Sequence, residues 1–106
     1  MFEIIDFKSG KVVLNDLDFD PNLSYEEQIW SFKEDILQVR YHNGFILDVG
    51  WYPEFNLEIG SFNIVVVQMD DWLNPIFERR TQDLHKLYSC IIEAIDVAKA
   101  AHFNSC

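Results

Sequence analysis

The stretch of residues 44–75 limits the possible folds most strongly, because it contains two strand-like runs and no lysine or arginine. The runs 45–51 and 61–69 are rich in β-branched and aromatic residues, which suit the pleated surface of a sheet. Between them, Pro53 and Gly60 are typical of a connection. The stretch therefore predicts two paired antiparallel strands, a central hairpin around which the rest of the chain is arranged.

The chain before this hairpin predicts three further strands and one helix. Residues 2–7 and 11–14 flank a turn that ends in a glycine, which predicts an N-terminal hairpin. Ser24 and Glu27 match a capping box, so a helix of about ten residues is expected to start there. A strand from about residue 36 then leads through the turn His42-Asn43-Gly44 into the central hairpin.

After the hairpin, residues 76–80 predict a short last strand and residues 81–100 an amphipathic helix. Thr81 is the expected N-cap, and the apolar residues follow the i, i+3, i+4, i+7 spacing of a helix that packs on a core. These residues are Leu84, Leu87, Tyr88, Ile91, Ile92, Ile95 and Ala98. The element order predicts an α+β fold: an antiparallel sheet of about five to six strands with two helices, the C-terminal helix packed on one face.

Length and apolar content predict one globular domain over residues 1–106. Single domains cluster at roughly 100 to 150 residues, and a hydrophobic fraction of 49% argues against disorder. The longest apolar run, 64–67, is far shorter than the roughly 20 residues that span a bilayer. Cys90 and Cys106 have neither disulfide-framework nor zinc-site spacing. A cytoplasmic protein without a membrane segment is expected.

Charge is the strongest global feature, with eighteen acidic against eight basic residues and a net charge of −10. This charge disfavours nucleic acid and anionic membranes as direct partners, because both are polyanions. Residues 1–75 hold fourteen of the acids and four of the bases, so a cationic partner would be attracted to that part. The alternative is that the charge only keeps the protein soluble.

Two groups of acidic residues are candidates for binding. Asp16, Asp18 and Asp20 alternate along an extended segment and are expected to face water or a partner. Their spacing resembles a calcium-binding loop, but Pro21 stands where that loop needs a glycine, so no metal or other cofactor is expected. The second group lies in the central stretch, where acids alternate with aromatic residues: Glu54, Glu58, Asp70 and Asp71 with Trp51, Tyr52 and Trp72.

Motifs for catalysis are missing, and the protein is expected not to be an enzyme. The sequence has no phosphate-binding glycine loop and no nucleophile motif. The histidines, His42, His85 and His102, lack metal-ligand spacing and are expected on the surface, whereas Cys90 is expected to pack on the apolar side of the last helix. Trp30 is expected in the core. Trp51 and Trp72 also favour core positions, with interface anchors as the alternative.

The combination LDVGWYPE at 47–54, GSFNIVV at 60–66 and DWLNP at 71–75, followed by a strand and a helix, resembles small bacterial immunity proteins of polymorphic toxins. The similarity is closest to those of contact-dependent growth inhibition systems and covers about residues 44–100. It implies a protein that binds the toxin domain of a cognate effector, often a basic nuclease, and blocks it. Immunity families share no fixed binding motif, so the resemblance assigns no residue roles.

The predicted toxin-binding residues therefore rest on physical grounds. Acidic side chains would speed the encounter with a cationic active site, and aromatic side chains would hold the complex. They are Asp16, Asp18, Asp20, Trp51, Tyr52, Glu54, Glu58, Asp70, Asp71 and Trp72. Two other functions stay open: an acidic adaptor domain with an unrelated protein partner, and a small enzyme that uses a carboxylate pair such as Asp70 and Asp71.

Overall fold

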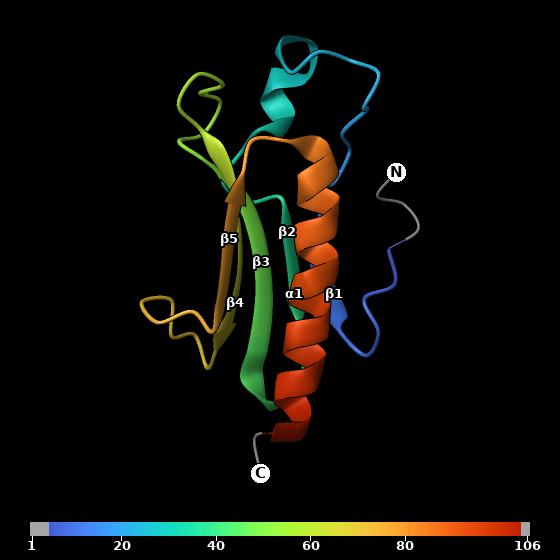
Figure 1. Cartoon of the computed structure of the whole chain (residues 1–106), viewed down its shortest axis with the longest axis vertical. Coiled ribbons are helices and arrows are strands. Elements are labelled where there is room, and N and C mark those ends of the chain that lie inside the picture. Colours follow the sequence, from blue (N-terminus) through green and yellow to red (C-terminus); the bar gives the residue numbers. More distant parts are fainter. Residues whose placement is uncertain (1–4, 105–106) are drawn as a thin grey trace.

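Figure 1 shows the computed structural model, which describes residues 5–104, with the side chains of 43 and 101–104 excepted. Its elements in chain order are β1 (Lys11–Asn15), the 3₁₀ helix η2 (Glu26–Ser31), β2 (Leu37–Arg40), the 3₁₀ turn η3 (His42–Gly44), β3 (Phe45–Tyr52), β4 (Ser61–Gln68), β5 (Phe77–Thr81) and α1 (Leu84–Asn104).

The strands form one five-stranded antiparallel sheet in the order β1-β2-β3-β4-β5, so each strand lies beside its neighbour in sequence. β3 and β4 pair along their whole length, which confirms the central hairpin. α1 crosses one face of the sheet and packs on β3, β4 and β5 (Figure 1). The predicted α+β fold, with the C-terminal helix on one face, is confirmed.

The core lies between α1 and the sheet. Alternate residues of β3 and β4 point toward the helix in register, as in the pairs Leu47–Val66 and Trp51–Phe62. The helix contributes its predicted apolar positions, of which Leu87 and Ile91 are fully buried. Burial of one such side chain contributes about 1.5–3 kcal/mol to folding, so this interface fixes the sheet on which the surface loops stand.

The predicted N-terminal hairpin is wrong over its described residues, although its second strand, 11–14, is present as β1. Residues 5–7 form no strand, and the chain turns at Lys8, which has a positive φ of 58°, while Gly10 N donates a hydrogen bond to Phe7 O (3.1 Å). Residues 2–4 of the predicted strand lie outside the described residues. Ile5 and Phe7 pack against the core instead of pairing with β1, so their apolar character reflects core contact. β1 pairs only with β2 among the described strands.

The capping box at Ser24 is confirmed, but the helix that it starts is shorter than predicted. Glu27 N donates to Ser24 Oγ (3.2 Å), and Ser24 N donates to Glu27 Oε1 (2.9 Å). η2 is nevertheless a six-residue 3₁₀ segment with a kink at Gln28, whose side chain bonds back to both backbone groups of Asp20. It buries none of its residues, and Trp30 is 73% exposed, so the predicted core position of Trp30 is wrong.

The start of α1 also differs from the prediction. Thr81 ends β5, and Asp83 takes the capping role, since its carboxylate accepts a hydrogen bond from His85 N (2.8 Å). Thr81 Oγ1 in turn accepts one from Asp83 N (3.1 Å). The helix continues to Asn104, beyond the expected end near residue 100. Over the described part of the chain, no helix combines the length and the apolar character that crossing a membrane requires.

Candidate functional site

The predicted binding residues lie at two opposite ends of the sheet. Residues 16–36 and 52–60, here called the acidic end, connect β1 to β2 and β3 to β4, whereas loop 69–76 connects β4 to β5 at the other end (Figure 1). Eight-residue strands separate these ends by roughly 25 Å. The acidic end holds Asp16, Asp18, Asp20, Tyr52, Glu54 and Glu58; the other end holds Asp70, Asp71 and Trp72.

The three tryptophans have three different environments. Trp51 is fully buried and donates from Nε1 to Asn56 O (2.9 Å), while its ring packs edge to face on Phe32 and Phe62. It presents no surface to a partner, so the core position is confirmed and the anchor role predicted for Trp51 is wrong. Trp72 is 45% exposed, so its favoured core position is wrong and an anchor role stays a prediction.

Charge is concentrated at the acidic end, where residues 16–36 and 52–60 contain nine carboxylates and one lysine. An open groove of about 610 Å³ lies there, and its walls combine aliphatic and charged side chains: Val13, Leu14, Asp16, Lys33, Asp35, Gln38 and Glu54. Leu14 pairs with Gln38 across β1 and β2, beside a register shift between Val12 and Leu14. Gln38 alternates with the buried Leu37 and Val39, so the groove opens on the face away from α1.

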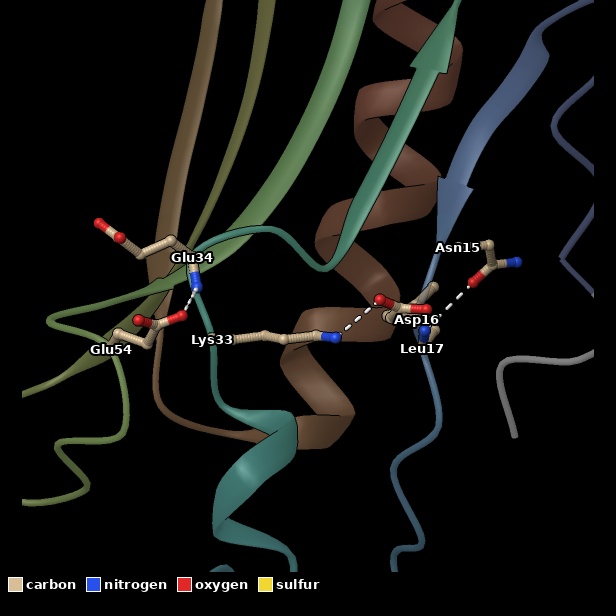
Figure 2. Close-up of polar contacts among 6 residues, drawn as sticks. All are labelled: Asn15, Asp16, Leu17, Lys33, Glu34 and Glu54. Carbon is tan, nitrogen blue, oxygen red and sulfur yellow. Dashed lines mark hydrogen bonds and ion pairs between the residues drawn. The ribbon is translucent and has the colours of Figure 1, made fainter.

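One ion pair crosses this groove. Lys33 Nζ lies 2.7 Å from Asp16 Oδ2, joining the segment before β2 to the segment after β1 (Figure 2). This hydrogen bond raises the pKa of the Lys33 ammonium above its ordinary value, with smaller contributions from the charges of Asp16, Asp18 and Asp35. Asn15 forms a local turn at the end of β1, where its side-chain oxygen accepts a hydrogen bond from Leu17 N (3.1 Å).

The connection between β3 and β4 is fastened to the segment before β2. Glu54 Oε1 accepts a hydrogen bond from Glu34 N (3.3 Å), as Figure 2 shows, and the Tyr52 hydroxyl donates to Glu34 O (3.2 Å). Burial, followed by the nearby charges of Asp48, Asp35, Glu34 and Glu54, raises the pKa of Tyr52. The local field is therefore negative and favours an added cation.

Asp48 in β3 is a partly buried carboxylate beside the groove residue Gln38. Gln38 Nε2 donates a hydrogen bond to Asp48 Oδ2 (3.1 Å), as expected from their pairing across β2 and β3. Burial raises the pKa of Asp48 above its ordinary value, the Gln38 bond lowers it, and the charge of Asp35 raises it further. The sheet beside the groove thus carries a carboxylate that would gain from a cationic neighbour.

Gly50 explains why the charged segment lies against the sheet. Trp51 N donates to Lys33 O (2.8 Å) and Ile36 N donates to Val49 O (3.0 Å), so residues 33–36 run along the end of β3. A Cβ atom at Gly50 would overlap the carbonyl oxygen of Glu34. Only glycine permits this approach, which positions Lys33 and Asp35 in the groove.

Other candidate chemistry is not assembled in the described residues. Nowhere between residues 5 and 104, where side chains are described, do three or more His, Cys, Asp or Glu residues come close enough together to hold a metal ion. Cys90 packs against the core as predicted, and burial raises the pKa of its thiol, which disfavours the reactive thiolate. His42 and His85 lie on the surface as predicted, whereas the side chain of His102 is outside the described set.

Sequence analysis identified two of the groove residues, Asp16 and Glu54, and missed the rest. The pairing of β1 with β2 brings Gln38 to the groove, and the close approach at Gly50 brings Lys33 and Asp35. No local sequence motif encodes either arrangement. The exposure of Trp30 was also missed, because the sequence does not show that η2 is a short, kinked segment. No protein-family model, curated protein or solved structure matches the chain.

Proposed function

We propose that this chain is an immunity protein that binds the toxin domain of a contact-dependent growth inhibition system, a basic nuclease, in the cytoplasm and occludes its active site. The observation that carries the proposal is the concentration of nine carboxylates and one lysine around the groove of the acidic end. A nuclease active site is built to attract a polyanion, and this surface offers one.

The groove suits binding because its two kinds of wall have different roles. Carboxylates that face outward attract a cationic partner and raise the association rate, mainly at low salt. Aliphatic walls such as Val13 and Leu14 can lose water against the stem of a basic side chain, which slows dissociation.

The polar groups in the groove also favour binding over catalysis. Lys33 is paired with Asp16, and its raised pKa keeps it a charged ammonium, which is neither a base nor a nucleophile near neutral pH. Glu54 holds the backbone of Glu34. Groups already committed to neighbouring contacts are suited to forming a fixed surface, so a non-catalytic inhibitor is the function proposed.

The test is co-expression with the toxin domain encoded immediately upstream, followed by co-purification and a nuclease assay. The charge-reversal pair Asp35→Lys with Glu54→Lys should abolish protection and complex formation at moderate salt. The matched pair Asp70→Lys with Asp71→Lys makes the same charge change at the opposite end and should leave both intact. If only the Asp70→Lys with Asp71→Lys pair lost protection and complex formation, the interface would lie at loop 69–76. If the unmodified chain neither bound the toxin domain nor protected the cell, the proposed function would be overturned.

A second candidate, an adaptor domain with an unrelated protein partner, is favoured by the opposite end of the sheet. There Leu73 is 92% exposed and lies in the same loop as the exposed Met69 and Trp72. A single protein that co-purifies from the native host through this loop, with no toxin complex, would support the adaptor.

A further inference from the structure

Two aromatic side chains form an exposed pair at the acidic end. Trp30 of η2 and Phe55 of the β3–β4 connection meet edge to face, with ring centroids 5.1 Å apart and an interplanar angle of 77°. Figure 1 shows these two segments at the same end of the molecule, η2 in teal and the connection in yellow-green. Tryptophan usually buries much of its large surface, yet Trp30 is 73% exposed. The pair therefore offers apolar surface that folding leaves uncovered.

The pair is held in place by its surroundings. Phe55 N donates a hydrogen bond to Phe32 O (2.7 Å). Phe32 is fully buried and directly follows η2. Phe55 has a positive φ of 60°, a conformation that costs a bulky residue about 1–3 kcal/mol and persists only where neighbouring structure imposes it. The capping box fixes the start of η2 on the other side. The rings are thus preorganised, which lowers the entropy cost of binding.

The charges around the pair indicate what would bind there. Glu26 and Glu27 lie on η2, Glu54 and Glu58 lie on the β3–β4 connection, and residues 22–32 and 53–60 contain no lysine or arginine. Aromatic rings attract cations through their faces, and carboxylates pair with a guanidinium through two parallel hydrogen bonds. Arginine combines both contacts, whereas lysine is a more strongly hydrated point charge.

The aromatic pair and the groove adjoin each other. Glu54, which lines the groove, directly precedes Phe55 in the chain. A partner segment that places one basic side chain in the groove can therefore place a neighbouring one on the rings.

We propose that Trp30 and Phe55 form the anchor of the binding surface, where an arginine of the partner protein stacks on the Trp30 ring and pairs with an adjacent glutamate. The identity of the partner rests on the proposed function. The anchor itself does not, because it follows from exposed rings held among carboxylates.

The anchor can be tested without a toxin, using hexa-arginine and hexa-lysine peptides as probes of equal charge. In ¹⁵N-resolved spectra of the full chain, hexa-arginine should shift the Trp30 indole signal at lower concentration than hexa-lysine. Trp30→Ala should weaken hexa-arginine binding roughly two- to fivefold. Trp72→Ala, which removes an indole ring at the opposite end of the sheet, should leave the affinity for hexa-arginine unchanged. Equal binding of both peptides, or an unchanged affinity of Trp30→Ala, would overturn the anchor.

The toxin complex supplies the second measurement. Trp30→Ala should raise the Kd about tenfold or more, mainly through faster dissociation, as expected for a central aromatic anchor. Trp30→Phe keeps a ring against Phe55 and should give an intermediate Kd, which separates lost stacking from a folding defect. A complex that tolerates Trp30→Ala but not Trp72→Ala would reject the anchor and keep the immunity function. Arginine-selective binding at Trp30 without any toxin complex would reject the immunity function and keep the anchor.

Discussion

The ammonium of Lys33 lies 2.7 Å from the carboxylate of Asp16, so the one lysine of the acidic end is already paired within the chain. The pair spans the groove between the segments that follow β1 and precede β2. It leaves Asp35, and the second carboxylate oxygen of Glu54, open to a cation from outside. Lys33 nevertheless adds positive charge to a surface whose proposed partner is also positive.

Lys33→Met should therefore tighten binding of a cationic partner. The change removes a repulsive charge and frees Asp16, while an exposed ion pair contributes only about 0–1 kcal/mol to stability. Association rates with hexa-arginine, measured at low and high salt, should rise most at low salt. Lys86→Met, which removes an exposed lysine of α1, serves as the control and should have a smaller effect. Weaker binding of Lys33→Met would mean that Lys33 itself contacts the partner.

Gly50→Ala should destabilise the protein and disturb the groove together. The new Cβ would overlap the Glu34 carbonyl oxygen and push residues 33–36 away from β3. Overpacking of this kind costs about 1–3 kcal/mol, opposite in sign to the usual gain of about 0.4–1 kcal/mol from replacing glycine by alanine. Urea unfolding measures the free energy, and hexa-arginine titration measures the groove. A more stable variant would show that the close approach at Gly50 is not required.

Asp48→Asn should stabilise the fold at neutral pH. Because burial raises the pKa of Asp48, the folded protein binds its proton more tightly than the unfolded chain does. The loss of folding free energy caused by the charged carboxylate is absent below the pKa of Asp48 in the unfolded chain, about 3.9. It grows as the pH rises through the pKa of the folded state and is complete above that value. The amide oxygen can still accept the Gln38 hydrogen bond. Urea unfolding should show a gain at pH 7 that disappears near pH 3.5; a gain independent of pH would contradict this explanation.

Tyr41→Phe should leave the stability unchanged or raise it by up to about 1 kcal/mol, because it removes a buried hydroxyl that has no hydrogen-bond partner among the described residues. Burial, with a smaller effect from Asp6, raises the pKa of Tyr41 from 10.0 to about 12. Between these values the unfolded chain ionises first, so the folded state loses stability as the pH rises. The variant should show a shallower alkaline decline in thermal unfolding. A loss of stability at neutral pH would reveal a partner for the hydroxyl.

The parts of the fold that sequence predicted are those fixed by local periodicity. The alternation in β3 and β4 and the i, i+3, i+4 spacing of α1 each mark a buried face over many residues. The predicted length of the first helix was wrong because a capping box determines where a helix starts but not how long it is. Gln28 bonds back to Asp20 and kinks η2, and that contact depends on the path of the preceding loop.

The candidate site was less predictable because its residues meet through tertiary contacts. Composition located the negative charge in the first three-quarters of the chain but not its division between two ends. That division follows from the direction of each strand, which places Glu54 at one end and Asp70 at the other. Trp30 was expected in the core because a helix usually buries its apolar residues, but η2 is too short to present such a face.

Among the strands that the structure describes, β1 and β5 form the two edges of the sheet, and each carries a feature that opposes pairing with another copy. β1 begins with Lys11 and is interrupted by the register shift after Val12, while β5 presents the exposed charges of Glu78, Arg79 and Arg80. Bulges and charges on an edge prevent the strand addition that leads to aggregation. Both edges therefore disfavour the addition of a strand from a second copy. The proposed inhibitor would depend on this property, because each molecule would neutralise a single toxin molecule and the supply would have to exceed the toxin.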